Sequence, residues 1–246
     1  MSNGELAIIV VASLVGSLVK SVTGMGYPLI AIPIVSLFIS VEDAVVVIAV
    51  PNTAANLLLN VHARAAARET RDLPVLAATA VVGAIVGTLV LVRVPDEPLL
   101  LALAATIVVY VVQFVRSPSL TIDPATSRRW SPVAGSAAGF MQGAVGVSGP
   151  VVAMWFHGYR LGKDAFVFSV TLLFLVSGAA QALLLLATGE FDRDRSVAAA
   201  LAMVATLAMI PVGTRLRGRL DIATFERLVL ALLVVSAVAL VARSLG

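Results

Sequence analysis

Long apolar runs separated by short polar segments are the dominant pattern of this 246-residue chain. A helix needs about 17–25 predominantly apolar residues to cross a bilayer. Six runs reach this length or fall slightly short of it: residues 43–61, 73–92, 99–115, 165–188, 197–212 and 225–241. The pattern therefore predicts an all-α integral membrane protein with at least six spanning helices.

Glycine and proline interrupt two further apolar regions. The first interruption is Gly24-Met25-Gly26-Tyr27-Pro28, and the second, 122 residues later, is Gly146-Val147-Ser148-Gly149-Pro150. Glycine permits unusual backbone angles, and proline suits the first turn of a helix. We expect a helix, an unwound turn and a second helix at each break. The flanking arms have the length of re-entrant segments: residues 6–19, 28–39, 133–144 and 150–156.

The duplication extends over most of the chain. Asp72 and Asp194 also lie 122 residues apart, and the element Gly87-Thr88 followed by Arg93 is matched by Gly213-Thr214 followed by Arg219. We predict a first transmembrane repeat at 1–115, a polar connector at 116–131 and a second repeat at 132–246.

The distribution of Lys and Arg indicates how the second broken pair crosses the membrane. If it returns as a hairpin, 11 basic residues share one side and 4 the other, whereas a single crossing gives 9 and 6. Cytoplasmic loops carry an excess of Lys and Arg, so the hairpin is favoured. By analogy the first pair is also a hairpin. Each repeat then has an odd number of crossings, which predicts two inverted repeats, each made of a broken, re-entrant helical hairpin plus three transmembrane helices. The 11 are Arg64, Arg68, Arg71, Arg116, Arg128, Arg129, Arg160, Lys163, Arg215, Arg217 and Arg219.

Composition supports a membrane protein and argues against several other classes. Hydrophobic residues make up 60% of the chain, charged residues 13%, and mean hydropathy is +1.04. A soluble domain carries about 25% charged residues. The net charge of +3 is explained by membrane topology, so we expect no nucleic-acid partner. The chain has no cysteine and no recognisable catalytic, metal-binding or ATP-binding motif. We expect neither a cofactor nor an enzyme, and any transport would run down an ion or solute gradient.

Lys20 is the candidate for charge recognition. It is the only charged residue between Glu5 and Glu42 and lies about one helical turn before the first break. A cation inside the membrane is costly and marks a functional candidate, although at a helix end it can also snorkel to water. The helix starts near Pro28 and Pro150 present free NH groups and a positive dipole end, which suits an anion. The alternative is that the glycines serve only close helix packing.

Amide side chains form a second candidate group. Asn52, Asn56 and Asn60 recur every four residues, so they share one helical face. They suit either an oxyanion or an interhelical hydrogen-bond seam. Gln142 lies just before the second break. Two other classes stay open at this point, a cation carrier and a non-transporting membrane scaffold, and so does homo-oligomer formation.

The glycine motifs resemble those of the TauE/SafE family of membrane anion exporters. The resemblance lies in Gly16-x7-Gly24-Met25-Gly26-Tyr27-Pro28, in Gly139-x3-Gly143-x2-Gly146-x2-Gly149-Pro150 and in Pro51-Asn52-Thr53. It implies a multi-pass transporter of the bacterial inner membrane that moves sulfite, sulfonates such as sulfoacetate, or related sulfur-containing anions. By position it implies a substrate site at both breaks, with Asn52 and Asn56 alongside: Thr23, Gly24, Met25, Gly26, Tyr27, Gly146, Val147, Ser148 and Gly149. Tyr27 and Lys20 depart from the family's usual pattern.

Overall fold

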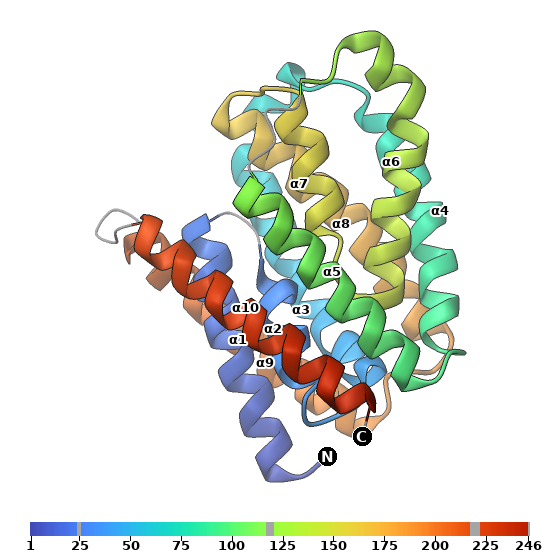
Figure 1. The fold of residues 1–246 in the computed structure, drawn as a ribbon, viewed down its shortest axis with the longest axis vertical. Helices are drawn as coiled ribbons and strands as arrows, with labels where there is room; N and C mark the ends of the chain where they lie inside the picture. The colour runs from blue at the N-terminus through green and yellow to red at the C-terminus, as the bar shows by residue number, and fades with distance from the viewer. Residues whose placement is uncertain (24–25, 117–120, 217–221, 246) are drawn as a thin grey trace.

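The computed structural model describes residues 1–23, 26–116, 121–216 and 222–245. Within them the chain is helical, with one short 3-10 segment and no strand (Figure 1). The first half comprises α1 (Asn3–Thr23), α2 (Tyr27–Val35), α3 (Val41–Ala63), η1 (Arg64–Glu69), α4 (Leu73–Leu91) and α5 (Asp96–Arg116). The second comprises α6 (Pro124–Val145), α7 (Gly149–Gly158), α8 (Lys163–Ala187), α9 (Arg193–Leu216) and α10 (Ile222–Leu245).

Seven helices in the described residues are long and apolar enough to span a membrane. Six of them correspond to the six runs expected from the sequence, and α1 is the seventh. The expectation that this arm is limited to residues 6–19, the length of a re-entrant segment, was therefore wrong. The helix also includes Asn3 to Glu5 and Lys20 to Thr23, which are polar or lie beside polar residues.

The first arm of the second break is likewise longer than residues 133–144. Helix α6 has 22 residues and begins at Pro124, inside the segment expected to be a connector. The Asp123 side chain caps it by accepting hydrogen bonds from the amides of Ala125 and Thr126, and proline is at home in a first turn. Each break thus joins a long helix to a short one, since α2 has 9 residues and α7 has 10.

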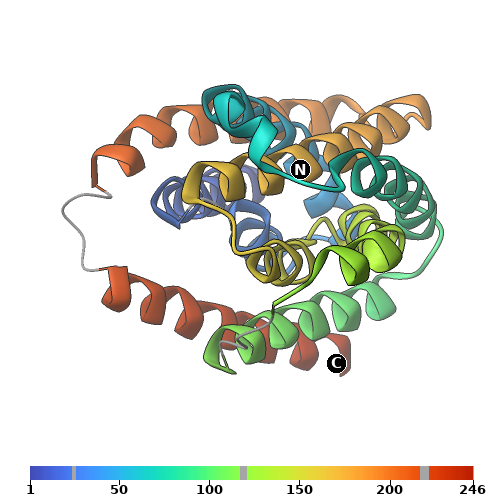
Figure 2. The same cartoon turned by 90° about the horizontal axis from the view of Figure 1, so that it is seen from above.

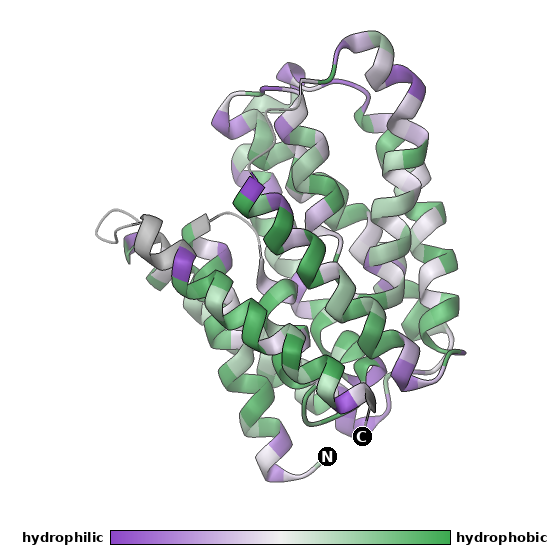
Figure 3. Cartoon of the chain, in the orientation of Figure 1, coloured by the Kyte–Doolittle hydropathy of each residue, from purple (hydrophilic) through white to green (hydrophobic). Residues whose placement is uncertain are grey.

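Polar contacts place the ends of the helices on two opposite faces, and Figure 3 shows the hydrophilic residues gathered there. On the face that holds both termini, here called the terminal face, Arg195 binds Glu42, Asp43 and Glu190 at 2.7–2.9 Å. The amino terminus of Met1 pairs with Asp194 on the same face. Hence α1, α3 and α9 all begin there.

The opposite face, here called the connector face, holds the start of α6 and the end of α7. The amide of Ile122 donates to the carbonyl of Gly158 at 2.8 Å, and Ser127 donates to Asp72. On the terminal face, Arg243 donates to the carbonyl of Ser36, directly after α2. The pair α1–α2 therefore starts and ends on the terminal face, and the pair α6–α7 starts and ends on the connector face.

The long arm of each broken pair packs against a helix of the other half. Helix α6 lies along α4, and α1 lies along α9. From above (Figure 2), α5 and α10 line one side of the bundle, α9 lines the other, and the broken helices lie between them. Large apolar side chains such as Val82, Val108, Leu186, Val204 and Val235 are exposed around the bundle, as expected for a lipid-facing surface.

Candidate functional site

Each break contains a turn that depends on glycine. Gly26, which precedes α2, has φ +112°. Gly146, which follows α6, has φ +71°. Side chains other than glycine rarely adopt such angles. Proline occupies the first turn of α2 and of α7, as expected, and among the described residues no side chain caps either helix start. Gly24 and Met25 lie outside the described residues, as does the side chain of Thr23.

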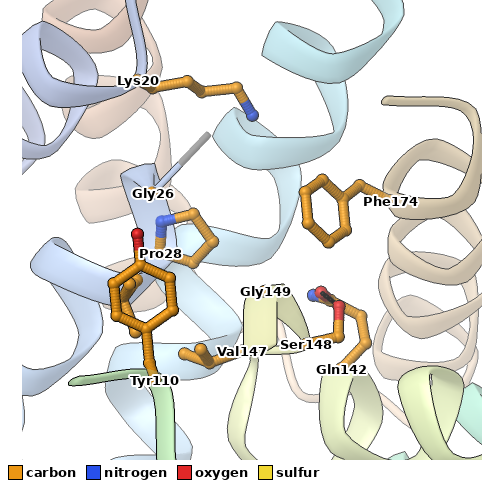
Figure 4. A pocket seen from close by; sticks show the side chains of 10 residues that line it. Lys20, Gly26, Pro28, Tyr110, Gln142, Val147, Ser148, Gly149 and Phe174 are labelled. Carbon is orange, nitrogen blue, oxygen red and sulfur yellow. Dashed lines mark hydrogen bonds between the residues drawn. The ribbon is translucent and has the colours of Figure 1, made fainter. Parts of the chain in front are cut away.

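A pocket lies between the two breaks (Figure 4). Residues from both halves and from both short helices contribute to it. Its lining comprises Lys20, Gly26, Pro28, Leu29, Tyr110, Gln142, Val147, Ser148, Gly149 and Phe174. Lys20 is the only charged residue in this lining.

Lys20 extends from α1 to α3 and is 2% exposed. Its Nζ donates hydrogen bonds to Oδ1 of Asn52 at 3.2 Å and to Oδ1 of Asn56 at 2.6 Å. Asn56 also donates from Nδ2 to Oδ1 of Asn52 at 3.2 Å. No carboxylate in the described part of the chain forms an ion pair with Lys20. The ammonium is therefore buried among neutral amides and does not snorkel to the surface.

In the second half, Gln142 occupies the place that corresponds to Lys20, 122 residues earlier. Gln142 donates from Nε2 to Oε1 of Gln181 at 3.1 Å, and Ser148 donates to Oε1 of Gln142 at 3.1 Å. Gln181 in turn donates to the backbone carbonyls of Gln142 and Gly143 at 2.9 and 3.1 Å. These bonds hold the end of α6 against α8 and give this side of the pocket a neutral polar surface.

The structure brings together six of the expected site residues at the pocket surface, namely Lys20, Gly26, Gln142, Val147, Ser148 and Gly149. Asn52 and Asn56 stand behind Lys20 and hold its ammonium.

Two expected residues lie elsewhere. Tyr27 is completely buried, and its hydroxyl meets Ser13 at 3.2 Å instead of lining the pocket. Gly146 turns the chain against Ile32 and Val45. Tyr27 lies away from the pocket because the start of α2 turns its side chain towards α1.

Asn60 belongs to an interhelical seam, which was the alternative for this amide face. Its Nδ2 donates to the carbonyl of Phe168 at 3.0 Å and to Thr171 at 3.2 Å. The amide face of α3 is thus divided between two roles along its length: two asparagines hold the lysine, and the third joins α3 to α8.

Four lining residues were not anticipated: Pro28, Leu29, Tyr110 and Phe174. Phe174 could have been found, because it lies 122 residues after Asn52, the same interval that relates the two breaks. Tyr110 lies within an apolar run and carries no such signal.

Apolar helices form the outside of the protein, and a buried lysine, amides and two broken helices surround an internal pocket. This arrangement defines a multi-pass membrane protein with a polar internal site. A family model described as Sulfite exporter TauE/SafE matches residues 8–240. The chain therefore belongs to the TauE/SafE family of sulfite and organosulfur exporters, whose members are membrane transporters and not enzymes. Neither the curated proteins nor the solved structures give a match.

Proposed function

We propose that this protein is a secondary transporter of sulfite and small sulfonates, such as sulfoacetate, in a bacterial inner membrane. The observation that carries the proposal is that both helix breaks and Lys20 line one pocket. The NH groups at the starts of α2 and α7 and the Lys20 ammonium supply donors and positive potential for the oxygens of one anion.

The cost of burying Lys20 supports an anionic ligand. A buried charge is expensive unless it is paired and hydrogen-bonded. Asn52 and Asn56 accept hydrogen bonds from Lys20 but supply no opposite charge. A bound anion would supply the counter-charge, which gives the site a reason to bind sulfite or a sulfonate in preference to a neutral solute.

If the two halves are inverted repeats, they provide a mechanism of alternating access. One broken pair starts and ends on the terminal face and the other on the connector face. Two hairpins that enter from opposite faces and meet at one pocket allow the site to open to either side when the halves rock. In this mechanism the anion stays between the breaks while access to it changes.

The same pocket argues against a cation carrier, because its lining residues include the ammonium of Lys20 and no carboxylate. The scaffold alternative would leave the burial of Lys20 without a purpose. Both alternatives are separated from the proposal by ligands: stabilisation by metal cations in a thermal-shift panel would favour a carrier, and stabilisation by no ligand a scaffold.

The test is uptake of ³⁵S-labelled sulfite into proteoliposomes preloaded with unlabelled sulfite. Truncating one partner of a buried charged contact costs about 2–5 kcal/mol, so Lys20→Gln is expected to reduce uptake by about 30-fold or more. Lys163→Gln is the matched control, because Lys163 is exposed at the start of α8. Unchanged uptake by Lys20→Gln would remove Lys20 from the site, and a wild-type protein that carries no sulfur anion would overturn the function.

A further inference from the structure

The empty pocket carries positive charge that the described side chains do not balance. Lys20 is buried, and its ammonium donates to the neutral amides of Asn52 and Asn56. The starts of α2 and α7 face the same pocket, since Gly26 and Gly149 line it (Figure 4). Each helix start is equivalent to roughly half a positive charge, so Lys20 and the two helix starts together amount to about two positive charges.

The carboxylates in the described part of the chain lie away from Lys20. Each belongs to the first turn of an α-helix or to a segment between two α-helices. On the terminal face several are already paired: Arg195 binds three of them, and Nη2 of Arg243 lies 3.7 Å from Oδ2 of Asp96. Within the described ranges, the counter-charge for Lys20 therefore has to come from a ligand.

This imbalance matters most while the site changes its access from one face to the other. Between the two open states the site is closed to water on both faces, and a charge without an opposite charge is unfavourable there. A bound anion removes the imbalance. A monoanion neutralises Lys20, and a dianion matches Lys20 together with the two helix starts. The loaded carrier can thus change its access with either charge form of sulfite, whereas the empty carrier cannot do so readily.

From this imbalance we infer that the protein is an obligate anion exchanger, whose carrier returns only when a second anion occupies the site. The inference rests on the proposed function and adds its counter-substrate, a small oxyanion from the other side of the membrane. Sulfite export continues under this rule as long as an anion enters in return. Lys20 sets the requirement, because its charge holds back the empty carrier.

The test compares two modes of ³⁵S-labelled sulfite efflux from proteoliposomes that contain the full chain. In the exchange mode the outside solution contains unlabelled sulfite, and in the net mode it contains gluconate, a much larger anion. Potassium and valinomycin hold the membrane potential at zero in both modes, so that a build-up of charge does not slow net efflux. We expect exchange to be at least about tenfold faster, since each ~1.4 kcal/mol added to a barrier slows a rate tenfold and an unpaired buried charge exceeds this.

Asn56→Asp is the informative change, because it gives Lys20 a fixed counter-ion. Oδ1 of Asn56 accepts from Lys20 at 2.6 Å, so an aspartate of nearly the same shape places an opposite charge at hydrogen-bond distance. The carboxylate competes with the anion and lowers both rates. It also balances the empty site, so we expect the ratio of exchange to net efflux to fall to within about threefold. Asn56→Ser is the neutral matched control and should keep the ratio at about tenfold or more.

Net efflux as fast as exchange in the wild type would overturn the inference and leave the anion site intact. An Asn56→Asp protein that keeps the wild-type ratio, or an Asn56→Ser protein that loses it, would show that the charge of Lys20 does not set the requirement. If labelled sulfite leaves in neither mode, the proposed function fails as well. The wild-type ratio tests the inference even if Asn56→Asp does not fold.

Discussion

The long arms of the two broken pairs bury small residues at equivalent positions, but the residues differ. Helix α6 presents Gly135, Gly139 and Gly143, here called the glycine face. The residues 122 positions earlier on α1 are Ser13, Ser17 and Ser21, here called the serine face. All six residues are buried.

The glycine face brings two backbones into contact. A Cβ placed at Gly139 would lie 2.0 Å from the carbonyl oxygen of Ala80, and one at Gly143 would lie 2.3 Å from that of Ala84. Glycine at such spacing is the small-xxx-small pattern of tightly packed membrane helices. The arm that carries Gln142 is therefore held close to α4 along its length.

The serine face is more polar and less completely satisfied. Ser21 donates to the carbonyl of Ser17 at 2.7 Å, and Ser13 meets the Tyr27 hydroxyl. The hydroxyl of Ser17 is buried and has no hydrogen-bond partner within the described ranges. The arm with the charged residue thus leaves one buried hydroxyl unsatisfied, whereas the arm that carries Gln142 brings its backbone directly against α4. The two halves therefore hold equivalent arms in different ways.

The largest expected effect comes from transferring serine to the glycine face. Gly139→Ser must push α4 and α6 apart because its Cβ would overlap the Ala80 carbonyl. Overpacking of this kind costs about 2–3 kcal/mol, so we expect a large loss of thermal stability in detergent. Ser17→Gly is the reciprocal change, and it should lose far less. A Gly139→Ser protein as stable as the wild type would show that the two faces are interchangeable.

Opposite signs are expected at the two equivalent pocket positions. Lys20→Met removes a buried cation, whose burial costs several kcal/mol, and orphans the Asn56 oxygen, which costs about 1–3 kcal/mol. We therefore expect a gain of about 1–2 kcal/mol in stability together with loss of anion binding. Gln142→Met removes only hydrogen bonds to Gln181 and Ser148 and should lower stability by about 1 kcal/mol. Thermal unfolding of both variants tests this, and a shift of the same sign in both would contradict it.

The elements of this comparison differ in how far the sequence predicts them. The apolar runs and the paired Gly/Pro motifs predict an all-helical membrane protein with two breaks, because element length and backbone freedom are local properties. Gly139 and Gly143 stand in the glycine motif that resembles the family, and close packing is the alternative that the sequence offers for the glycines of the breaks. The four-residue spacing of Gly139 and Gly143 is itself a packing signal.

The pocket itself depends on contacts that no local pattern contains. Burial of Lys20 among Asn52 and Asn56 could be anticipated from a lone charge and a four-residue amide spacing. Tyr110 and Phe174 look like any aromatic residue in an apolar run, and only the arrangement of α5 and α8 around the breaks brings them to the pocket. The length of α1 was underestimated because apolar content alone stops at the residue before Lys20.

A smaller effect is expected from alanine at the turning glycines. Gly146→Ala and Gly26→Ala each force a side chain into a positive-φ conformation, which costs about 1 kcal/mol or slightly more. Gly146→Ala should be the more damaging of the two. Its Cβ would lie 2.3 Å from Cδ1 of Ile32 on α2, whereas the nearest atom to a Cβ at Gly26 is 3.4 Å away.

Gly149→Ala is the matched control for Gly146→Ala, since no heavy atom within 4 Å would meet its Cβ and its φ is not positive. The unfolding temperature of Gly149→Ala should be close to that of the wild type. If all three alanine variants unfold at the same temperature, the turns do not depend on glycine, and the difference between the two breaks has no energetic basis.

The smallest expected effect is a gain from Ser17→Ala on the serine face. The substitution removes a buried hydroxyl for which the described residues offer no partner, and alanine is the better helix former by about 0.5 kcal/mol. The temperature of thermal unfolding should therefore rise slightly. The matched variant Ser13→Ala should not gain, because Ser13 loses its contact with the Tyr27 hydroxyl. If Ser17→Ala loses as much stability as Ser13→Ala, the Ser17 hydroxyl has a hydrogen-bond partner. The serine face would then be fully hydrogen-bonded, and the contrast with the glycine face would not lie in unsatisfied groups.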